Sequence, residues 1–225
     1  MSIEMVVDRG ISSLGIYSYY GFAEEVVVEK GRVDLREHVK GLINNLLSTY
    51  TLDRIKDNPT IRSYREIMWR LGIDPTKVRV SSEAMLRRVI KNGSFPYINN
   101  VVDSCNIASL ETLIPISVFD IDKVSPPLTL RYSRSGEEFV DVDDNVRILR
   151  GVEVVLADSR TVLHLYPHRD SKPSSVDMNT RKVLVVAYGA PGIPNSLVRE
   201  AVGRAFKYLS MFCYARYLSE VFKVG

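Results

Sequence analysis

The order of helical and strand-like segments is the feature of this sequence that most restricts its fold. Between residues 116 and 188, short runs rich in β-branched and aromatic residues are divided by turns rich in Pro, Gly and Asp, which is typical of strands. The runs are ISVFDI, LTLRYS, FVDV, VRIL, VEVVLAD, TVLHLY and KVLVVAY. Helical patterns lie before and after this group. Because strands and helices do not alternate one by one, we expect an α+β (mixed α/β) fold.

Apolar residues recur at helical spacing on both sides of the strand group. The last such segment, residues 195–222, has an apolar side that runs from Leu197 to Cys213 and predicts a long helix packed on the sheet. The opening 32 residues alternate β-rich runs with glycines, which predicts strands and turns. The expected helices are residues 33–50, 63–75, 81–93, 101–113 and 195–222.

The length of 225 residues and the hydrophobic content of 45% fit one domain with a substantial core. Within residues 1–225 we expect N-terminal strands and a helix in residues 1–60, a core in residues 63–192 and a C-terminal helix in residues 194–224. No apolar run approaches the ~20 residues that span a bilayer, and the first residues lack the pattern of a secretory signal. We therefore expect a cytoplasmic protein with no membrane partner.

The composition gives no sign of a metal or cofactor. The cysteines, Cys105 and Cys213, lie far apart in sequence, and none of His38, His164 and His168 is near a cysteine. We expect two buried thiols in a reducing compartment, although the sequence leaves a disulfide open. The net charge of +3 permits RNA binding without arguing for it, and we expect no DNA partner.

The first candidate site is an apolar stretch, INNVVDSCNIASLETLIPISVFD, that carries several short polar residues. On a helix, Asn99, Asp103 and Asn106 fall along one stripe. The stripe has no Lys, Arg or Glu, which favours contact with a small polar ligand. In a second interpretation, Asn99 or Asn100 caps the helix, and the other polar residues face water or bond to neighbouring backbone.

The second candidate site is the polar segment YPHRDSKPSSVDMNTRKV between two expected strands. His168, Arg169, Asp170 and Ser171 are adjacent there, and loops held by a rigid sheet often carry function. We do not expect a Ser-His-Asp relay, because adjacency in sequence does not create one and no nucleophile-elbow pattern is present. A purely hydrogen-bonded loop, with its arginine paired to Asp170 or Asp177, also fits.

The third candidate site is basic. Arg79, Arg87, Arg88 and Lys91 flank or lie on the helix expected at residues 81–93. Such a cluster suits phosphate groups, and a solvated helix face explains it equally well.

Several collinear segments resemble a known family. They are YREIMWRLGIDPTKVRVSSEAMLRRV, INNVVDSCNIASLETLIPISVFDIDK, LRYSRSGEEF, VVLAD, HRDS and NTRKVLVVAYG, within residues 63–192. This order resembles the B3/4 editing module of the phenylalanyl-tRNA synthetase beta subunit, and more closely the freestanding proteins built from that module. The resemblance implies a three-layer fold containing a β-sandwich with flanking helices. It also implies hydrolysis of the ester of mischarged tRNA in trans, with tRNA and an aminoacyl-tRNA synthetase as expected partners.

The resemblance also implies residue roles. Asp170 would orient water or hold the substrate ammonium, Asp103 and Asn106 would fix the α-amino end, and backbone amides near residues 169–171 would face the oxyanion. Further substrate contacts are expected from Asn99, Asn100, Cys105, Ser117, His168 and Ser171. The expected contacts to tRNA phosphates are Arg87, Arg88 and Arg169.

Three positions depart from the motif of the bacterial synthetases. Threonine stands there at the position of Cys105, histidine at that of Ser117 and glutamate at that of Asp170, so specificity for tyrosine is not transferred. Two other functions therefore stay open. One is a non-catalytic module that binds tRNA or a synthetase, and the other is an enzyme acting on a free amino acid or another small molecule.

Overall fold

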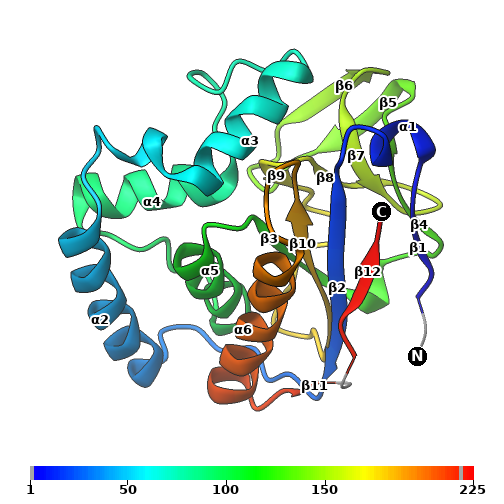
Figure 1. Cartoon of the computed structure of the whole chain (residues 1–225). Helices are drawn as coiled ribbons and strands as arrows, with labels where there is room; N and C mark the ends of the chain where they lie inside the picture. The colour runs from blue at the N-terminus through cyan, green and yellow to red at the C-terminus, as the bar shows by residue number, and fades with distance from the viewer. Residues whose placement is uncertain (1–2, 218–219) are drawn as a thin grey trace.

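Two β-sheets face each other, and helices cover the outer face of one of them (Figure 1). The computed structural model describes residues 3–217 and 220–225. The helix-covered sheet has the strand order β11-β2-β10-β3, with β12 also paired to β2. Its strands are β2 (Tyr17–Glu24), β3 (Ile116–Asp120), β10 (Lys182–Gly189), β11 (Arg216–Tyr217) and β12 (Phe222–Val224).

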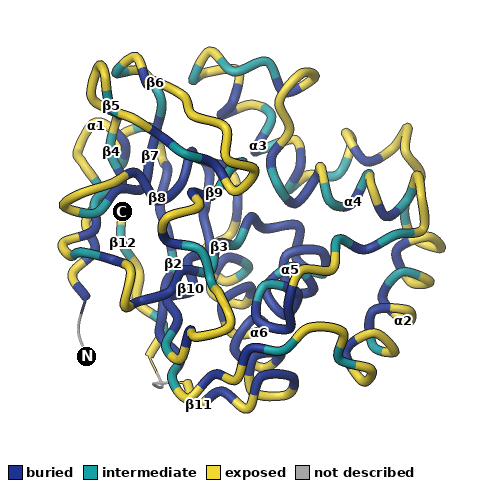
Figure 2. The backbone as a smooth tube through the Cα atoms, turned by 180° about the vertical axis from the view of Figure 1, so that it is seen from behind, coloured by how far each residue is buried: buried dark blue, intermediate teal, exposed yellow. Residues whose placement is uncertain are grey.

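The second sheet has the order β1-β4-β7-β8-β9, and a separate hairpin, β5–β6, extends beside it. The second sheet consists of β1 (Met5–Val7), β4 (Leu128–Tyr132), β7 (Val154–Ala157), β8 (Val162–Leu165) and β9 (Arg169–Asp170). The hairpin consists of β5 (Ser135–Val140) and β6 (Val146–Arg150). Most of the hairpin is exposed, whereas the central strands of both sheets are buried (Figure 2).

The longer helices lie on the side of the first sheet that faces away from the second (Figure 1). They are α2 (Val33–Thr49), α3 (Pro59–Arg70), α4 (Ser81–Asn92), α5 (Asn100–Thr112) and α6 (Asn195–Cys213), and a short α1 (Arg9–Ser12) follows β1. Short 3₁₀ turns span Ile55–Asp57 and Ile121–Lys123.

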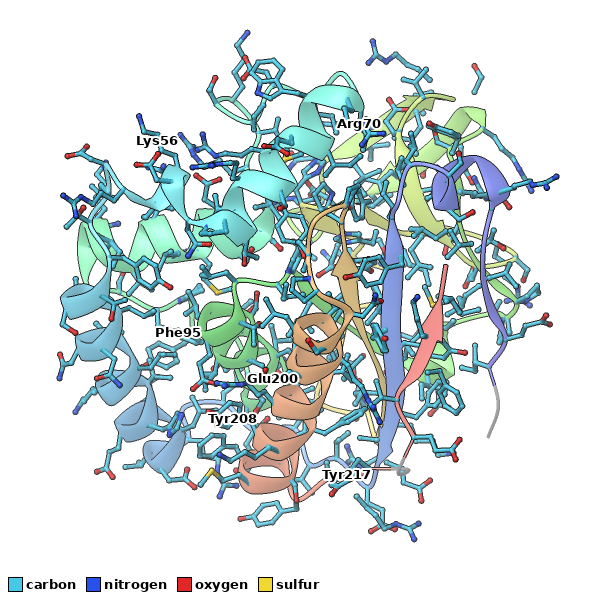
Figure 3. All side chains as sticks on the ribbon, in the orientation of Figure 1. Lys56, Arg70, Phe95, Glu200, Tyr208 and Tyr217 are labelled. Atoms are coloured by element: carbon cyan, nitrogen blue, oxygen red, sulfur yellow. The ribbon has the colours of Figure 1, made fainter. Side chains whose placement is uncertain are left out.

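Helices α5 and α6 form the inner pair. They pack on each other, and α6 contacts β10 and β2 while α5 contacts β3. The outer helix α2 joins them through an aromatic contact: Tyr208 of α6 points towards α2, where its ring centroid lies 5.0 Å from that of His38 (Figure 3). The apolar stripe of each helix therefore has a buried partner, as helical spacing requires.

Strand β10 shows why the arrangement is a sandwich. All its residues after Lys182 are buried, because one face packs on the helices and the other on the second sheet. On the inner face, the ring of Tyr188 stacks on the ring of His164 from β8, with centroids 4.3 Å apart. The expected α+β class and its β-sandwich are thus confirmed.

The open edge of this sandwich lies at β3 and β9. Each is the last strand of its sheet in the described residues, and next to β9 only an isolated bridge joins Ser171 to Asp141 of the hairpin. Helix α5 leads directly into β3 through Leu113, which ends the helix in a left-handed conformation with φ 58°. The chain thus brings α5, β3 and β9 together where the sheets end.

The C-terminal helix is shorter than the sequence pattern predicts. The prediction ran to residue 222, but α6 ends at Cys213, and Tyr214 turns the chain with φ 57°. The following residues pair with β2 as β11 and β12, while residues 218–219 lie outside the described part. Helical and strand spacing overlap in so short a segment, and the free edge of β2 decides between them.

The opening residues are part of the core. Strand β2 pairs along its whole length with β10, so the first sheet cannot form without it. The β-rich run at residues 24–29, part of the opening segment for which strands and turns were expected, forms no strand after Glu24, because Glu25 adopts φ 62° and the chain leaves the sheet there. Val26 and Val28 are still buried beneath the helices.

Candidate functional site

A pocket of about 420 Å³ opens at the free edge of the sandwich. Val102 and Asn106 of α5 form one wall, because residues four apart share a face of a helix. Phe119 of β3 and Val142 at the tip of the β5–β6 hairpin line it as well, and the segment 168–172 closes the opposite side. Both polar and apolar side chains line the pocket, which suits a small amphipathic ligand.

Asp170 is a carboxylate in the wall of this pocket. Its Oδ1 accepts a hydrogen bond of 2.5 Å from Oγ of Ser117 and lies 2.8 Å from Nδ1 of His164. The side chain of Asp170 is 37% exposed, whereas that of His164 is 3% exposed. Hydrogen bonds from described residues reach Oδ1 only, so Oδ2 is open to a ligand.

This cluster is not the relay of a serine hydrolase. Oγ of Ser117 lies 3.3 Å from Nδ1 of His164, the same nitrogen that faces Asp170. In a relay, the serine and the carboxylate contact opposite nitrogens of the imidazole. Ser117 is also 1% exposed and does not line the pocket, so its hydroxyl serves Asp170 and not a substrate.

His164 was not among the predicted site residues. It lies on β8, whose four residues are all buried, and the sequence signal was a single histidine in an otherwise apolar strand. Spacing could not show its partners, because Ser117 is 47 residues away along the chain.

The two asparagines at the start of α5 bond to backbone. Asn99 caps the helix by accepting from the amides of Val101 and Val102. The Asn100 side chain accepts from the amide of Glu29 and donates to two carbonyl groups, so all of its bonds go to other segments. These contacts match the capping interpretation of the stripe, and neither residue lines the pocket.

The remaining stripe residues face different ways. Asn106 lines the pocket, but Asp103 points to the helix start, where its Oδ1 accepts from the amide of Ile98 at 2.9 Å. Burial raises the pKa of Asp103 to about 6. Cys105 is buried behind the pocket, and burial raises the pKa of its thiol far above the ordinary value. Both cysteines are free.

The loop residues after β8 are brought together as expected, with different contacts. Arg169 pairs with Asp141 and Asp143 and so ties the hairpin tip to the pocket. Ser171 is buried and its Oγ lies 2.8 Å from that of Ser174. Burial, with smaller effects of nearby charges, lowers the pKa of His168 to about 4, so the imidazole is neutral at pH 7.

A second hollow, of about 530 Å³, lies on the other side of His168 and Arg169, which line both spaces. Exposed basic side chains line it, among them Lys77, Arg79 and Arg147. Among the described residues, Arg79 and Arg147 have no ion-pair partner.

Two arginines of α4, both expected to bind tRNA, differ in whether the side chain is already engaged in an ion pair. Arg87 donates to Glu83, whose side chain is fully buried and also pairs with Arg65. Arg87 thereby compensates a buried charge. Arg88 is exposed and stays a candidate for a phosphate contact.

The fold and the pocket agree with comparisons to known proteins. A family model described as "B3/4 domain" matches residues 63–214, which is more than half of the chain. The chain belongs to the B3/4 domain family. This match includes the pocket residues on α5, β3 and β9 and extends the resemblance seen in the sequence through α6.

Relatives of this B3/4 protein are phenylalanine–tRNA ligase beta subunits. The subunit from Fusobacterium nucleatum is 27% identical over 90% of this chain and 24% of its own length. The one from Nocardia farcinica is 34% identical over 52% of this chain and 14% of its own length. The chain thus spans about a quarter or less of these relatives.

A solved structure supports the fold. It is an N-terminal fragment of the phenylalanyl-tRNA synthetase beta subunit from Pyrococcus horikoshii, with a TM-score of 0.53 and 13% sequence identity. The similarity covers 99% of the B3/4 chain and 54% of that fragment, so the opening residues belong to the shared architecture. No helix in the described residues is long and apolar enough to cross a membrane.

Proposed function

We propose that this protein hydrolyses the ester bond of mischarged aminoacyl-tRNA in trans. The observation that carries the proposal is Asp170: a carboxylate at a pocket wall, whose Oδ1 accepts from the Ser117 hydroxyl and lies 2.8 Å from Nδ1 of His164, while Oδ2 is open. An oxygen fixed in this way can hold an attacking water without first having to reorient. Membership of the B3/4 family and its synthetase relatives support a tRNA substrate.

The reaction needs one proton acceptor and one attacking water. The water oxygen bonds to the ester carbonyl carbon while one water proton passes to Asp170. The bond between that carbon and the ribose oxygen then breaks, and the ribose oxygen takes the proton from Asp170. The products are a free amino acid and a tRNA with a free terminal hydroxyl, and the carboxylate is restored.

Other pocket groups have binding roles in this proposal. Asn106 lies across the pocket and forms no side-chain hydrogen bond with another described residue, so its amide is free for the aminoacyl group. Backbone amides of residues 169–171 are partly engaged: the amide of Ser171 donates to Leu163. The volume of about 420 Å³ accommodates an amino acid and part of the terminal nucleoside.

The RNA backbone would follow the second hollow. Arg79 and Arg147 are exposed there and form no ion pair with a residue that the structure describes, and His168 and Arg169 connect this hollow to the pocket. Unpaired cations beside an active site attract a polyanion and release its counterions. Arg88 stays a further candidate, whereas Arg87 is engaged with Glu83.

The test is release of labelled amino acid from a panel of correctly and incorrectly charged tRNAs. Asp170→Asn keeps an oxygen that accepts from Ser117 and His164, so folding should persist, while the proton acceptor is lost. We expect kcat to fall by about 10²- to 10⁴-fold. Asp53→Asn, an exposed aspartate without a side-chain partner among the described residues, is the matched control and should retain kcat.

The outcomes separate the candidate functions. Selective release that Asp170→Asn abolishes supports the hydrolase. Binding of uncharged tRNA in an electrophoretic shift assay, with no release from any charged tRNA, means a non-catalytic binding module. Absence of both means that the pocket serves a small molecule.

A further inference from the structure

His164 is the most constrained polar side chain near the pocket. One face of its ring stacks on Tyr188 with an interplanar angle of 8°. Its Nδ1 lies 2.8 Å from Oδ1 of Asp170, and its Nε2 is buried with no hydrogen-bond partner among the described residues. A buried polar atom without a partner costs about 1–3 kcal/mol, so this placement opposes stability. Such a cost points to a role in function.

We propose that His164 is the positioning residue for Asp170: its Nδ1–H donates to Oδ1 and, together with the Ser117 hydroxyl, turns Oδ2 towards the pocket. The inference rests on the proposed hydrolase function, which makes Asp170 the proton acceptor. It adds the residue that sets the orientation of this acceptor.

The charge of Asp170 assigns the proton to Nδ1. A contact of 2.8 Å between an imidazole nitrogen and a carboxylate oxygen requires a hydrogen between them, and an ionised carboxylate can only accept, so the imidazole is the donor. The hydroxyl of Ser117 donates to the same oxygen from β3, so two donors from different sheets converge on Oδ1. An oxygen with two converging donors has little rotational freedom, and its partner oxygen is fixed as well.

The stack on Tyr188 fixes the plane of the donor. Tyr188 belongs to β10, the central strand that is buried on both faces, so the ring beneath His164 cannot move aside. Backbone pairing adds a second restraint, because His164 and Asp170 are directly opposite each other in the β8–β9 ladder. The imidazole therefore holds Asp170 through a short and rigid connection.

The first readout does not depend on activity. In the protein labelled with ¹⁵N at histidine, the imidazole shifts of His164 report which nitrogen carries the proton. We expect the Nδ1–H tautomer. A spectrum of the Nε2–H tautomer would overturn the inference.

The second readout is kinetic. His164→Phe keeps the aromatic stack and removes the donor, and we expect kcat to fall by about 10- to 100-fold, the loss for one hydrogen bond to a charged group. KM should change little, because His164 does not line the pocket. His164→Asn restores a donor near the place of Nδ1 and should recover most of kcat. His38→Phe is the matched control, because His38 of α2 also packs on a tyrosine, Tyr208 of α6, and does not line the pocket.

Failure of the two proposals can be told apart. An active wild type whose kcat survives His164→Phe overturns the positioning role and leaves the hydrolase standing. A wild type that releases no amino acid refutes the hydrolase, and the ¹⁵N tautomer then decides on the donor. If His164→Phe does not fold, Ser117→Ala removes the other donor to Oδ1, and an unchanged kcat there would also overturn the inference.

Discussion

Replacing Asn100 by alanine should destabilise the fold rather than change the pocket. The Asn100 side chain accepts from the amide of Glu29 at 2.7 Å and donates to the carbonyls of Val27 and Phe212 at 2.8 and 2.9 Å. It thus joins the start of α5 to the segment after β2 and to the end of α6. Three hydrogen bonds at about 1 kcal/mol each, with buried backbone groups left unpaired, give a loss of about 3–5 kcal/mol.

The assay is urea unfolding, followed by circular dichroism, of Asn100→Ala beside Asn106→Ala. With a slope of about 3 kcal/mol/M, the Asn100 variant should unfold at about 1–2 M less urea than the wild type. Asn106 is the matched control, because it is on the same helix, lines the pocket and has a side chain that forms no hydrogen bond with another described residue. Its variant should unfold within about 0.5 kcal/mol of the wild type and lose deacylation.

The opposite pattern would refute this reasoning. If Asn100→Ala unfolds like the wild type and loses only activity, the side chain contacts substrate as the sequence suggested, and its bonds to the backbone contribute little. A loss of stability with kcat retained in the folded fraction would establish Asn100 as structural.

Three further predictions concern charged groups. Arg87→Ala should lower the free energy of unfolding, measured in urea, by about 1–3 kcal/mol, because the variant removes one of the two arginines that pair with the buried Glu83. If Arg87 instead binds RNA, the variant should lower only the affinity for tRNA. Folding raises the pKa of Asp103 from 3.8 to about 6, so the folded state binds the carboxyl proton more tightly than the unfolded state does. The protonated carboxyl therefore contributes its full stabilisation below pH 4, and this stabilisation is lost as the pH rises towards 6. Urea unfolding should therefore show that the free energy of unfolding of the wild type falls by about 2 kcal/mol between pH 4 and pH 7, and that this fall is absent in Asp103→Asn. An equal pH dependence in both proteins would contradict the raised pKa of Asp103. Replacing Arg79 and Arg147 together by alanine should weaken all tRNAs similarly and reduce the slope of log affinity against log salt by about 1.5, and an unchanged slope would exclude this path.

The class of the fold followed from periodicity because the sequence separates its helical and strand-like segments. Each expected strand between residues 116 and 188 is present, since β-branched runs bounded by turn residues have few other folded states. The end of α6 did not follow, because the residues after Cys213 owe their strand conformation to the free edge of β2. Local spacing contains no information on such distant pairing.

The candidate site was predictable only in part, again because local spacing does not show which distant segments come into contact. Asn106 and Asp170 both line the pocket: Asn106 stands out as a short polar residue in an apolar stretch, whereas Asp170 lies in a polar segment and was indicated by the family resemblance. His164 was missed although Asp170 is only six residues away, because its contacts with Ser117 and Tyr188 join strands that are distant in the chain. Asn100 was expected at the substrate, because its bonds to Val27 and Phe212 span 73 and 112 residues. The sequence shows that a polar residue lies within an apolar segment, but only the fold shows which groups form hydrogen bonds with its side chain.

The change at Ser117 gains a physical explanation from this arrangement. The bacterial synthetase motif has a histidine at that position, and here the imidazole of His164 lies 3.3 Å from the serine hydroxyl, on the opposing sheet. Ser117 is 1% exposed, so a second imidazole could not fit without displacing His164 or Tyr188. The small hydroxyl therefore leaves room for the stacked ring and adds a donor to Asp170.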